Sequence, residues 1–264
     1  MKIEVLFPEI ANLYGDLMNV KYLEDCIPDA EIIHTSLQMK PRFVDEEVDL
    51  VYMGTTTEQG QLLALEKLMP YRDVILKRIE EGGKFLITGN AMELFGKRIE
   101  EDGKLVCECL DIFPGIAKRS SINRFNSLFV GKFYPGKDER AGNEDGPITI
   151  VGFKSQFGHT FGESTDTELD PMGMMEAKRG PGLNRYAKCE GIRINNFMAT
   201  YVIGPLLVLN PPFTRWLIQE KLGVPIEKMA FEEAAMDCYE NRVAQYEDPN
   251  TGIYYWGGTN ERWT

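Results

Sequence analysis

The chain has 264 residues, of which 43% are hydrophobic and 27% are charged, as in ordinary soluble globular proteins. This length suits one large α/β domain, or such a domain with an appended C-terminal segment. The formal net charge of −12 argues against a phosphate-binding surface, so neither nucleic acid nor an anionic membrane is expected as a partner.

Signals for export and membrane insertion are not evident in the sequence. The chain begins with a strand-like segment, without a signal-peptide pattern, and no stretch of roughly 18 apolar residues predicts a spanning helix. The five cysteines are odd in number and irregularly spaced: Cys26, Cys107, Cys109, Cys189 and Cys238. Free thiols in a reducing compartment are therefore expected, and with them a cytoplasmic protein.

Short apolar runs alternate with helical patterns, which predicts an α/β fold with a layered sheet and helices on both of its faces. In the first third of the chain, strands are expected at residues 3–7, 31–34, 49–53 and 85–88, and helices at residues 17–26 and 59–81. The longer helix is expected to break near Pro70 and to end at Gly82 and Gly83.

The middle of the chain is less regular. Antiparallel strands are expected at residues 105–113 and 120–134, a mobile loop at 135–147, and late strands at 148–153 and 198–202. Residues 161–195 hold many glycines and charges and few periodic signals, which indicates an irregular loop layer over the sheet.

The C-terminal part is predicted to be helical, at residues 213–222 and 226–246. We therefore expect a domain of residues 1–225, with residues 226–264 forming a C-terminal helix and tail packed on the same domain. The tail contains the aromatic residues Tyr254, Tyr255, Trp256 and Trp263, which could dock on a surface.

Residues 84–96 carry the most informative pattern: a buried strand, a sharp turn and a helix, as in a nucleophile elbow. An elbow holds its nucleophile in a strained backbone conformation at the end of the strand, so that the side chain projects outward. In this chain Gly89 stands where the attacking side chain would be.

Six segments in the same order resemble class I (triad) glutamine amidotransferases. The closest branch is that of cobyric acid synthase and of the glutaminase subunit of lipid II isoglutaminyl synthase. The matching segments are Phe7 to Asp16, Gly54 to Gln61, the elbow with Leu94-Phe95-Gly96, Gly152 to Thr160, Glu190-Gly191, and Thr200 to Pro211. The resemblance implies a three-layer, flavodoxin-like mixed sheet with helices on both faces.

In this family a cysteine thiolate at the elbow attacks the glutamine side-chain amide and a histidine shuttles the proton. The resemblance places Gly89 at the cysteine position and Ile203 at the histidine position. Glycine adopts positive φ without steric cost, so it preserves the turn while removing the nucleophile. The remaining candidate nucleophiles are Thr88 and Cys189. Thr88 is β-branched and lies one residue before the position of the family's cysteine. Cys107 and Cys109 are expected to be buried small hydrophobic residues.

Five polar residues map by resemblance to segments at or near the former active centre: Thr55, Thr56, Asn90, Gln156 and His159. All five can form hydrogen bonds, and His159, at the position of an arginine in the family, could titrate near neutral pH. They predict a polar pocket at the carboxyl edge of the sheet for an amide or carboxylate ligand. Alternatively, they bond to one another and close the pocket. Asp16 is expected either to face this edge or to cap the helix that follows it.

No grouping of His, Cys and carboxylate residues has a metal-ligand spacing and no phosphate-binding loop occurs, so neither metal nor cofactor is expected. The resulting hypothesis is a degenerate glutaminase that binds a ligand or a partner, the partner being a Mur-ligase-like or cobyric-acid-synthase-like synthetase. The alternative is an active glutamine amidohydrolase that supplies ammonia for amidation of cobyric acid or a cell-wall precursor. A structural subunit of a homo-oligomer is a third possibility.

Overall fold

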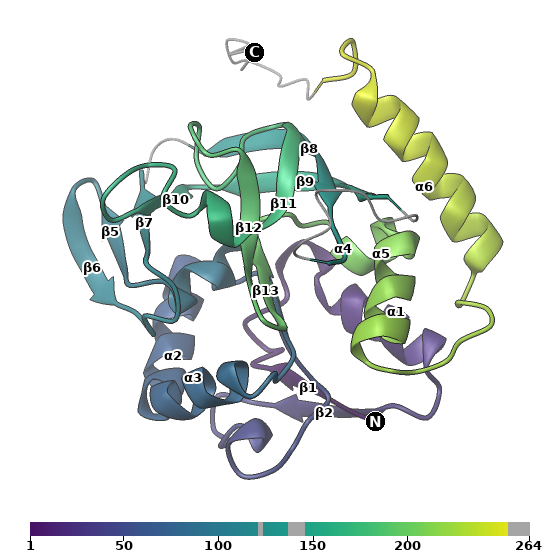
Figure 1. The fold of residues 1–264 in the computed structure, drawn as a ribbon. Coiled ribbons are helices and arrows are strands. Elements are labelled where there is room, and N and C mark those ends of the chain that lie inside the picture. Colours follow the sequence, from purple (N-terminus) through teal and green to yellow (C-terminus); the bar gives the residue numbers. More distant parts are fainter. Residues whose placement is uncertain (121–123, 137–145, 253–264) are drawn as a thin grey trace.

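The computed structural model describes residues 1–120, 124–136 and 146–252 (Figure 1). Within these residues one nine-stranded sheet runs in the order β2-β1-β3-β4-β13-β12-β11-β8-β9. Its strands are β1 (Lys2–Leu6), β2 (Glu31–Thr35), β3 (Leu50–Met53), β4 (Phe85–Thr88), β8 (Phe125–Phe133), β9 (Ile148–Gln156), β11 (Gly173–Arg179), β12 (Cys189–Ile194) and β13 (Phe197–Thr200). The strands from β2 to β13 are parallel, and the remaining pairs are antiparallel.

Helices cover both faces of this sheet (Figure 1). On one face lie α2 (Glu58–Leu68) and α3 (Arg72–Glu80); on the other lie α1 (Leu17–Cys26), α4 (Leu206–Leu209) and α5 (Pro211–Trp216). Successive strand side chains point to opposite faces, so Ile87 packs in the core with α2 and α3, while Leu86 packs in the core with α1 and α5. The predicted three-layer arrangement with a mixed sheet is confirmed.

A smaller sheet of four strands lies beside the main one in the described part of the chain, in the order β10-β7-β5-β6. Its strands are β5 (Arg98–Glu101), β6 (Lys104–Glu108), β7 (Gly115–Arg119) and β10 (Gly158–Gly162). Only Phe157 separates β9 from β10, so the chain passes directly from the edge of the main sheet into the smaller one. The strand predicted at residues 105–113 corresponds to β6, which ends earlier than predicted, at Glu108.

Several N-terminal elements have the predicted bounds or lie close to them. The helix α1 and the strand β4 agree with the prediction, and the helical segment after residue 58 breaks at a 3₁₀ turn, Met69–Tyr71, around Pro70. Proline has no N–H to donate within a helix, which explains the break. The aromatic residues Tyr254, Tyr255, Trp256 and Trp263, and most of the loop predicted at 135–147, lie outside the described residues.

The irregular loop layer predicted for residues 161–195 is wrong, because this segment contains the main-sheet strands β11 and β12. Charged residues in β12 obscured the strand pattern. Glu190 is fully buried, and its carboxylate accepts a hydrogen bond from the equally buried Lys154 ammonium at 2.5 Å. Buried charges are tolerated when they are paired, so a charged residue here does not indicate a loop.

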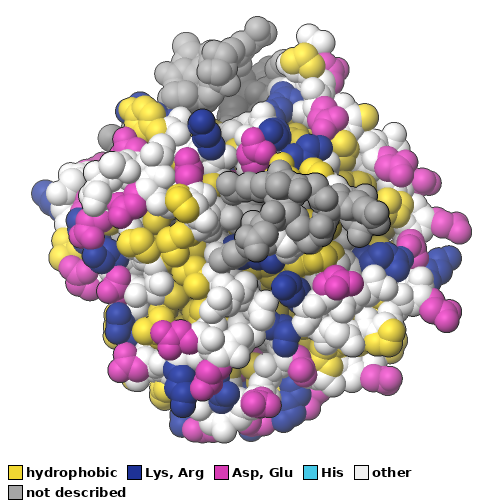
Figure 2. Space-filling model, in the orientation of Figure 1, with side chains coloured by type: hydrophobic (Ala, Val, Ile, Leu, Met, Phe, Trp, Pro, Cys, Tyr) yellow, Lys and Arg dark blue, Asp and Glu magenta, His cyan; other side chains and the backbone are white. Residues whose placement is uncertain are grey.

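The C-terminal helix α6 (Glu232–Glu247) begins later than expected and packs against β8 and β9. Tyr239 contacts Val130 and Val151, and its hydroxyl donates to the Thr149 carbonyl at 2.8 Å. The division of the chain at residue 225 stays a prediction. No helix in the described ranges is both long and apolar enough to cross a membrane. Figure 2 shows acidic and basic side chains interspersed over the visible face.

Candidate functional site

The elbow has the predicted backbone geometry. β4 ends at Thr88, Gly89 has φ +64°, and the helix that follows over Gly89–Phe95 is a 3₁₀ helix. This left-handed conformation disfavours any residue with a Cβ, which explains a glycine at the turn. The prediction of a positive φ at Gly89 is confirmed.

The space that a nucleophile would need at this turn is occupied. A Cβ atom on residue 89 would lie 2.0 Å from the Thr55 hydroxyl oxygen and 2.7 Å from the Thr55 Cβ. Both separations are far below van der Waals contact, so a side chain at position 89 requires Thr55 to move. The elbow therefore lacks both the nucleophile and the room for one.

Thr55 is held in place by the buried carboxyl group of Asp16. The Asp16 Oδ2 atom accepts hydrogen bonds from the Thr55 amide at 2.7 Å, the Thr55 hydroxyl at 2.6 Å and the Thr88 hydroxyl at 2.9 Å. Burial raises the pKa of the Asp16 carboxyl, and the hydrogen bonds from Thr55 and Thr88 oppose that shift. Asp16 makes no side-chain capping bond to α1, so the interpretation as a helix cap is wrong.

Thr56 and Asn90 are hydrogen-bonded to each other next to Thr55, at the carboxyl edge of the sheet. The Thr56 amide donates to the Asn90 side-chain carbonyl at 3.0 Å, and the Asn90 side-chain amide donates to the Thr56 carbonyl at 2.8 Å. Thr57, the next residue, caps α2 by accepting a hydrogen bond from the Gly60 amide. Thr55 and Asn90 therefore bond within the protein through their side chains, whereas Thr56 does so through its backbone and its buried hydroxyl has no partner in the described part of the chain.

Ile203 is buried and offers no proton-transfer group. Its backbone pairs with that of Phe153: the Ile203 amide donates to the Phe153 carbonyl at 2.9 Å, and the Phe153 amide donates to the Ile203 carbonyl at 3.2 Å. This backbone bridge with Phe153 fixes the position of Ile203, which the resemblance assigns to the catalytic histidine. The side chain of Ile203 is aliphatic and cannot transfer a proton.

A second buried network, which the sequence analysis missed, supports the turn after Gly89. Glu93 accepts hydrogen bonds from Arg119 at 2.9 and 3.1 Å, from the Gln61 amide at 3.0 Å and from the Tyr201 hydroxyl at 3.0 Å. Gln61, Glu93 and Tyr201 lie in the matched segments, so they carried a signal, whereas Arg119 is recognised only from its contacts. The network joins the elbow to β7 and the end of β13.

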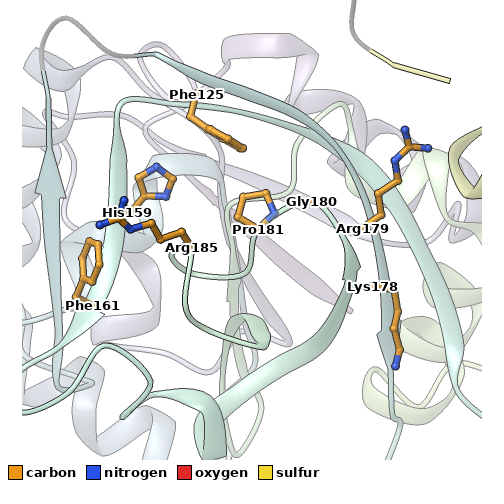
Figure 3. A pocket seen from close by; sticks show the side chains of 8 residues that line it. All are labelled: Phe125, His159, Phe161, Lys178, Arg179, Gly180, Pro181 and Arg185. Carbon is orange, nitrogen blue, oxygen red and sulfur yellow. The ribbon is translucent and has the colours of Figure 1, made fainter. Parts of the chain in front are cut away.

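Gln156 and His159 lie in a different place, at a cavity of about 630 Å³ (Figure 3). The Gln156 side-chain nitrogen donates to the Gly158 carbonyl at 2.6 Å and lies 3.3 Å from His159 Nδ1. The cavity is lined by Phe125, His159, Phe161, Lys178, Arg179, Gly180, Pro181 and Arg185. Of the predicted ligand-binding residues only His159 lines it, so the five residues form two groups.

The prediction that His159 titrates near neutral pH is wrong. Burial, together with the nearby positive charges of Lys154 and Arg185, lowers the pKa of His159 to about 4. The imidazole is therefore neutral at physiological pH. It can donate or accept a hydrogen bond, but it is a poor proton acceptor.

The two remaining candidate nucleophiles, Thr88 and Cys189, are both buried. The Thr88 hydroxyl is engaged by Asp16 and lies 3.0 Å from the Tyr52 hydroxyl. Cys189 is buried, and burial raises the pKa of its thiol, which disfavours the reactive thiolate. Cys109 is buried as expected, whereas Cys107 is only half-buried, with the two sulfur atoms 4.0 Å apart. Across the described ranges no cluster of three or more His, Cys, Asp or Glu residues could hold a metal ion.

Replacement of Gly89 by alanine tests the closed elbow. Gly89→Ala is expected to lower the free energy of unfolding by about 1–2 kcal/mol through the left-handed backbone and by a further ~1–3 kcal/mol through overpacking against Thr55. Gly15→Ala is the matched control, because Gly15 also has positive φ (+75°) but a Cβ there has nothing within 4 Å. Urea unfolding measures both variants, and equal losses would contradict the steric account.

The depressed pKa of His159 predicts a pH-dependent stability. Between the folded value of about 4 and the ordinary value of 6.5, the unfolded chain binds more protons than the folded chain. The free energy of unfolding should therefore fall by about 1–3 kcal/mol as pH is lowered through this window. Urea unfolding as a function of pH should show a smaller fall for His159→Gln and the wild-type fall for His34→Gln. An unchanged fall in His159→Gln would overturn the interpretation.

Comparison with known proteins gives one sequence relative. No protein-family model matches the chain. It is 26% identical over 230 residues to the lipid II isoglutaminyl synthase (glutamine-hydrolyzing) subunit GatD of Staphylococcus aureus (strain N315), covering 85% of this chain and 86% of that protein. Two solved structures are similar, each with a TM-score of 0.49. PurLQS from Thermotoga maritima is 11% identical, and the match covers 92% of this chain and 98% of that chain. A glutamine amidotransferase is 16% identical, and the match covers 84% of this chain and 99% of that chain. This sequence match makes the chain a homologue of GatD, similar to glutamine amidotransferases.

Proposed function

We propose that this chain is a glutamine amidotransferase-like subunit without glutaminase activity, which acts by binding an amidating synthetase. The observation that carries the proposal is the closed elbow, where Thr55 fills the space that a side chain on residue 89 would need. The relative is named as the glutamine-hydrolyzing subunit of a synthase, which supports a synthetase of the Mur-ligase-like or cobyric-acid-synthase-like type as the partner.

The chemistry of glutamine hydrolysis has no substitute at this centre. An amide is cleaved in this family when a thiolate attacks the carbonyl carbon and a histidine passes a proton to the leaving ammonia. Gly89 has no side chain, Ile203 has no titratable group, and His159 is neutral and lies at a separate cavity. Loss of such a catalytic unit costs on the order of 10⁶ in turnover.

The exposed apolar residues beside the elbow support a role in binding a partner. Leu13, Tyr14 and Met18 are exposed where the chain enters α1, and Met18 is 50% exposed. The Leu13 amide donates to the Thr55 carbonyl at 3.0 Å, so this segment lies directly next to the closed elbow. Clustered apolar side chains on a surface are typical of protein–protein contacts.

The absence of glutaminase activity is the direct test. Purified protein incubated with glutamine should release no more ammonia than a buffer blank, and Gly89→Cys/Ile203→His should not restore release, because Thr55 still blocks position 89. Ammonia release well above the blank, abolished by Thr88→Val or Cys189→Ala, would instead support the alternative, an active amidohydrolase with relocated residues.

Binding to a synthetase is tested by co-expression with a Mur-ligase-like or cobyric-acid-synthase-like enzyme. The proteins should co-elute in size-exclusion chromatography, and the complex should amidate its substrate with ammonium salts but not with glutamine. Met18→Glu should weaken the complex about tenfold, equivalent to ~1.4 kcal/mol. Leu105→Glu is the matched control, since Leu105 is similarly exposed (57%) but lies on β6. Glutamine-supported amidation, or equal effects of the two variants, would contradict the proposal.

A further inference from the structure

The cavity beside His159 is separate from the closed elbow. Its walls come from the first residue of β8, from β10, from the end of β11 and from the loop between β11 and β12 (Figure 3). None of Gly89, Thr55 and Ile203 lines it. At about 630 Å³ the cavity has the size of sites that bind small organic molecules.

The charge of this cavity is opposite to that of the whole chain. The chain carries a net charge of −12, yet the described residues that line the cavity include Lys178, Arg179 and Arg185 and no acidic residue. Lys178 is paired with Glu176 at 2.5 Å, and Arg179 donates to the Asp248 carbonyl at 2.9 Å. In the described part of the chain Arg185 forms no ion pair, and Figure 3 shows its side chain reaching toward His159 and Phe161.

His159 adds a neutral hydrogen-bond donor to this wall. The Gln156 side-chain amide nitrogen faces His159 Nδ1 at 3.3 Å, and an amide nitrogen can only donate. Nδ1 is therefore the acceptor in the neutral ring, which leaves the proton on Nε2. A neutral N–H group beside a guanidinium is suited to an anion, because both groups donate and neither repels negative charge.

The remaining walls are apolar and held in place. The Phe125 ring meets the His159 imidazole edge-on, with centroids 5.5 Å apart. The buried Lys154 ammonium donates to the carbonyls of Pro181 at 3.1 Å and Gly182 at 2.8 Å, which fixes the segment that forms the Pro181 wall. Walls already ordered before binding reduce the entropy lost when a ligand enters.

We propose that this cavity binds a small organic anion, a carboxylate or a phosphate ester attached to a ring. Arg185 and His159 hold the anionic group, and the ring lies against Phe125 and Phe161. The site does not depend on the absence of glutaminase activity, because none of the residues of the closed elbow contributes to it. The carboxylate and the phosphate ester share the same recognition chemistry, and the experiment below separates them.

The two histidines of the chain, His34 and His159, make the test simple. The probes are benzoate and phenyl phosphate, titrated near neutral pH against protein labelled at the histidine ring carbons, with His159→Gln assigning the signals. Matched probes are inorganic phosphate, which lacks the ring, and benzyl alcohol, which lacks the charge. At least one ring-bearing anion should shift the His159 signal saturably, with His34 unchanged, and should bind at least about tenfold more tightly than either matched probe.

Variants of the same loop test the role of the guanidinium. Arg185→Gln should weaken binding of the ring-bearing anion about tenfold or more, whereas Lys188→Gln, which removes the same charge three residues away outside the cavity, should change it less than about twofold. The tighter of benzoate and phenyl phosphate identifies the anionic group. The proposal is overturned if neither anion shifts His159 with a Kd below about 1 mM, if benzyl alcohol binds as tightly, or if Arg185→Gln and Lys188→Gln act alike.

Discussion

The buried carboxyl group of Asp16 ties together the parts of the structure on which this account depends. Through one oxygen it accepts hydrogen bonds from the residues that follow β3 and end β4, namely Thr55 and Thr88. These bonds hold Thr55 against Gly89, in the space where the family has its nucleophile. Bonds from a buried hydroxyl to a buried carboxyl are costly to leave unmade, so the closed elbow is part of the folded core rather than a loose surface feature.

The closed elbow at Gly89 and the open cavity at His159 are two distinct regions of this protein with different polar surroundings. Around Gly89 the side chains of Thr55 and Asn90 form hydrogen bonds within the protein, and the Glu93 network with Arg119 stabilises the turn. Around His159 the side chains leave a space lined by cations and rings. The glutamine amidotransferase-like fold is therefore combined with a cavity whose lining is cationic and aromatic.

The sequence was sufficient to predict those parts of the fold that depend on short, local residue patterns. The positive φ of Gly89 follows from the strand–turn–helix pattern, and the parallel half of the sheet follows from its buried apolar runs. The strand β12 is not predicted from the sequence, because the charge of Glu190 is paired with that of Lys154, far away in the sequence, only in the folded protein. The neutrality of His159 likewise arises from burial and neighbouring cations, which no spacing in the sequence encodes.

Covalent labelling tests the central proposal, that the elbow holds no nucleophile, most directly. A diazoketone analogue of glutamine alkylates the activated nucleophile of glutamine-hydrolysing enzymes, so intact-mass spectrometry after incubation reports whether one exists. The account predicts no adduct that glutamine protects against. A single stoichiometric adduct, suppressed by excess glutamine and mapped to Thr88 or Cys189, would contradict it, because it would reveal an activated nucleophile at the carboxyl edge of the sheet.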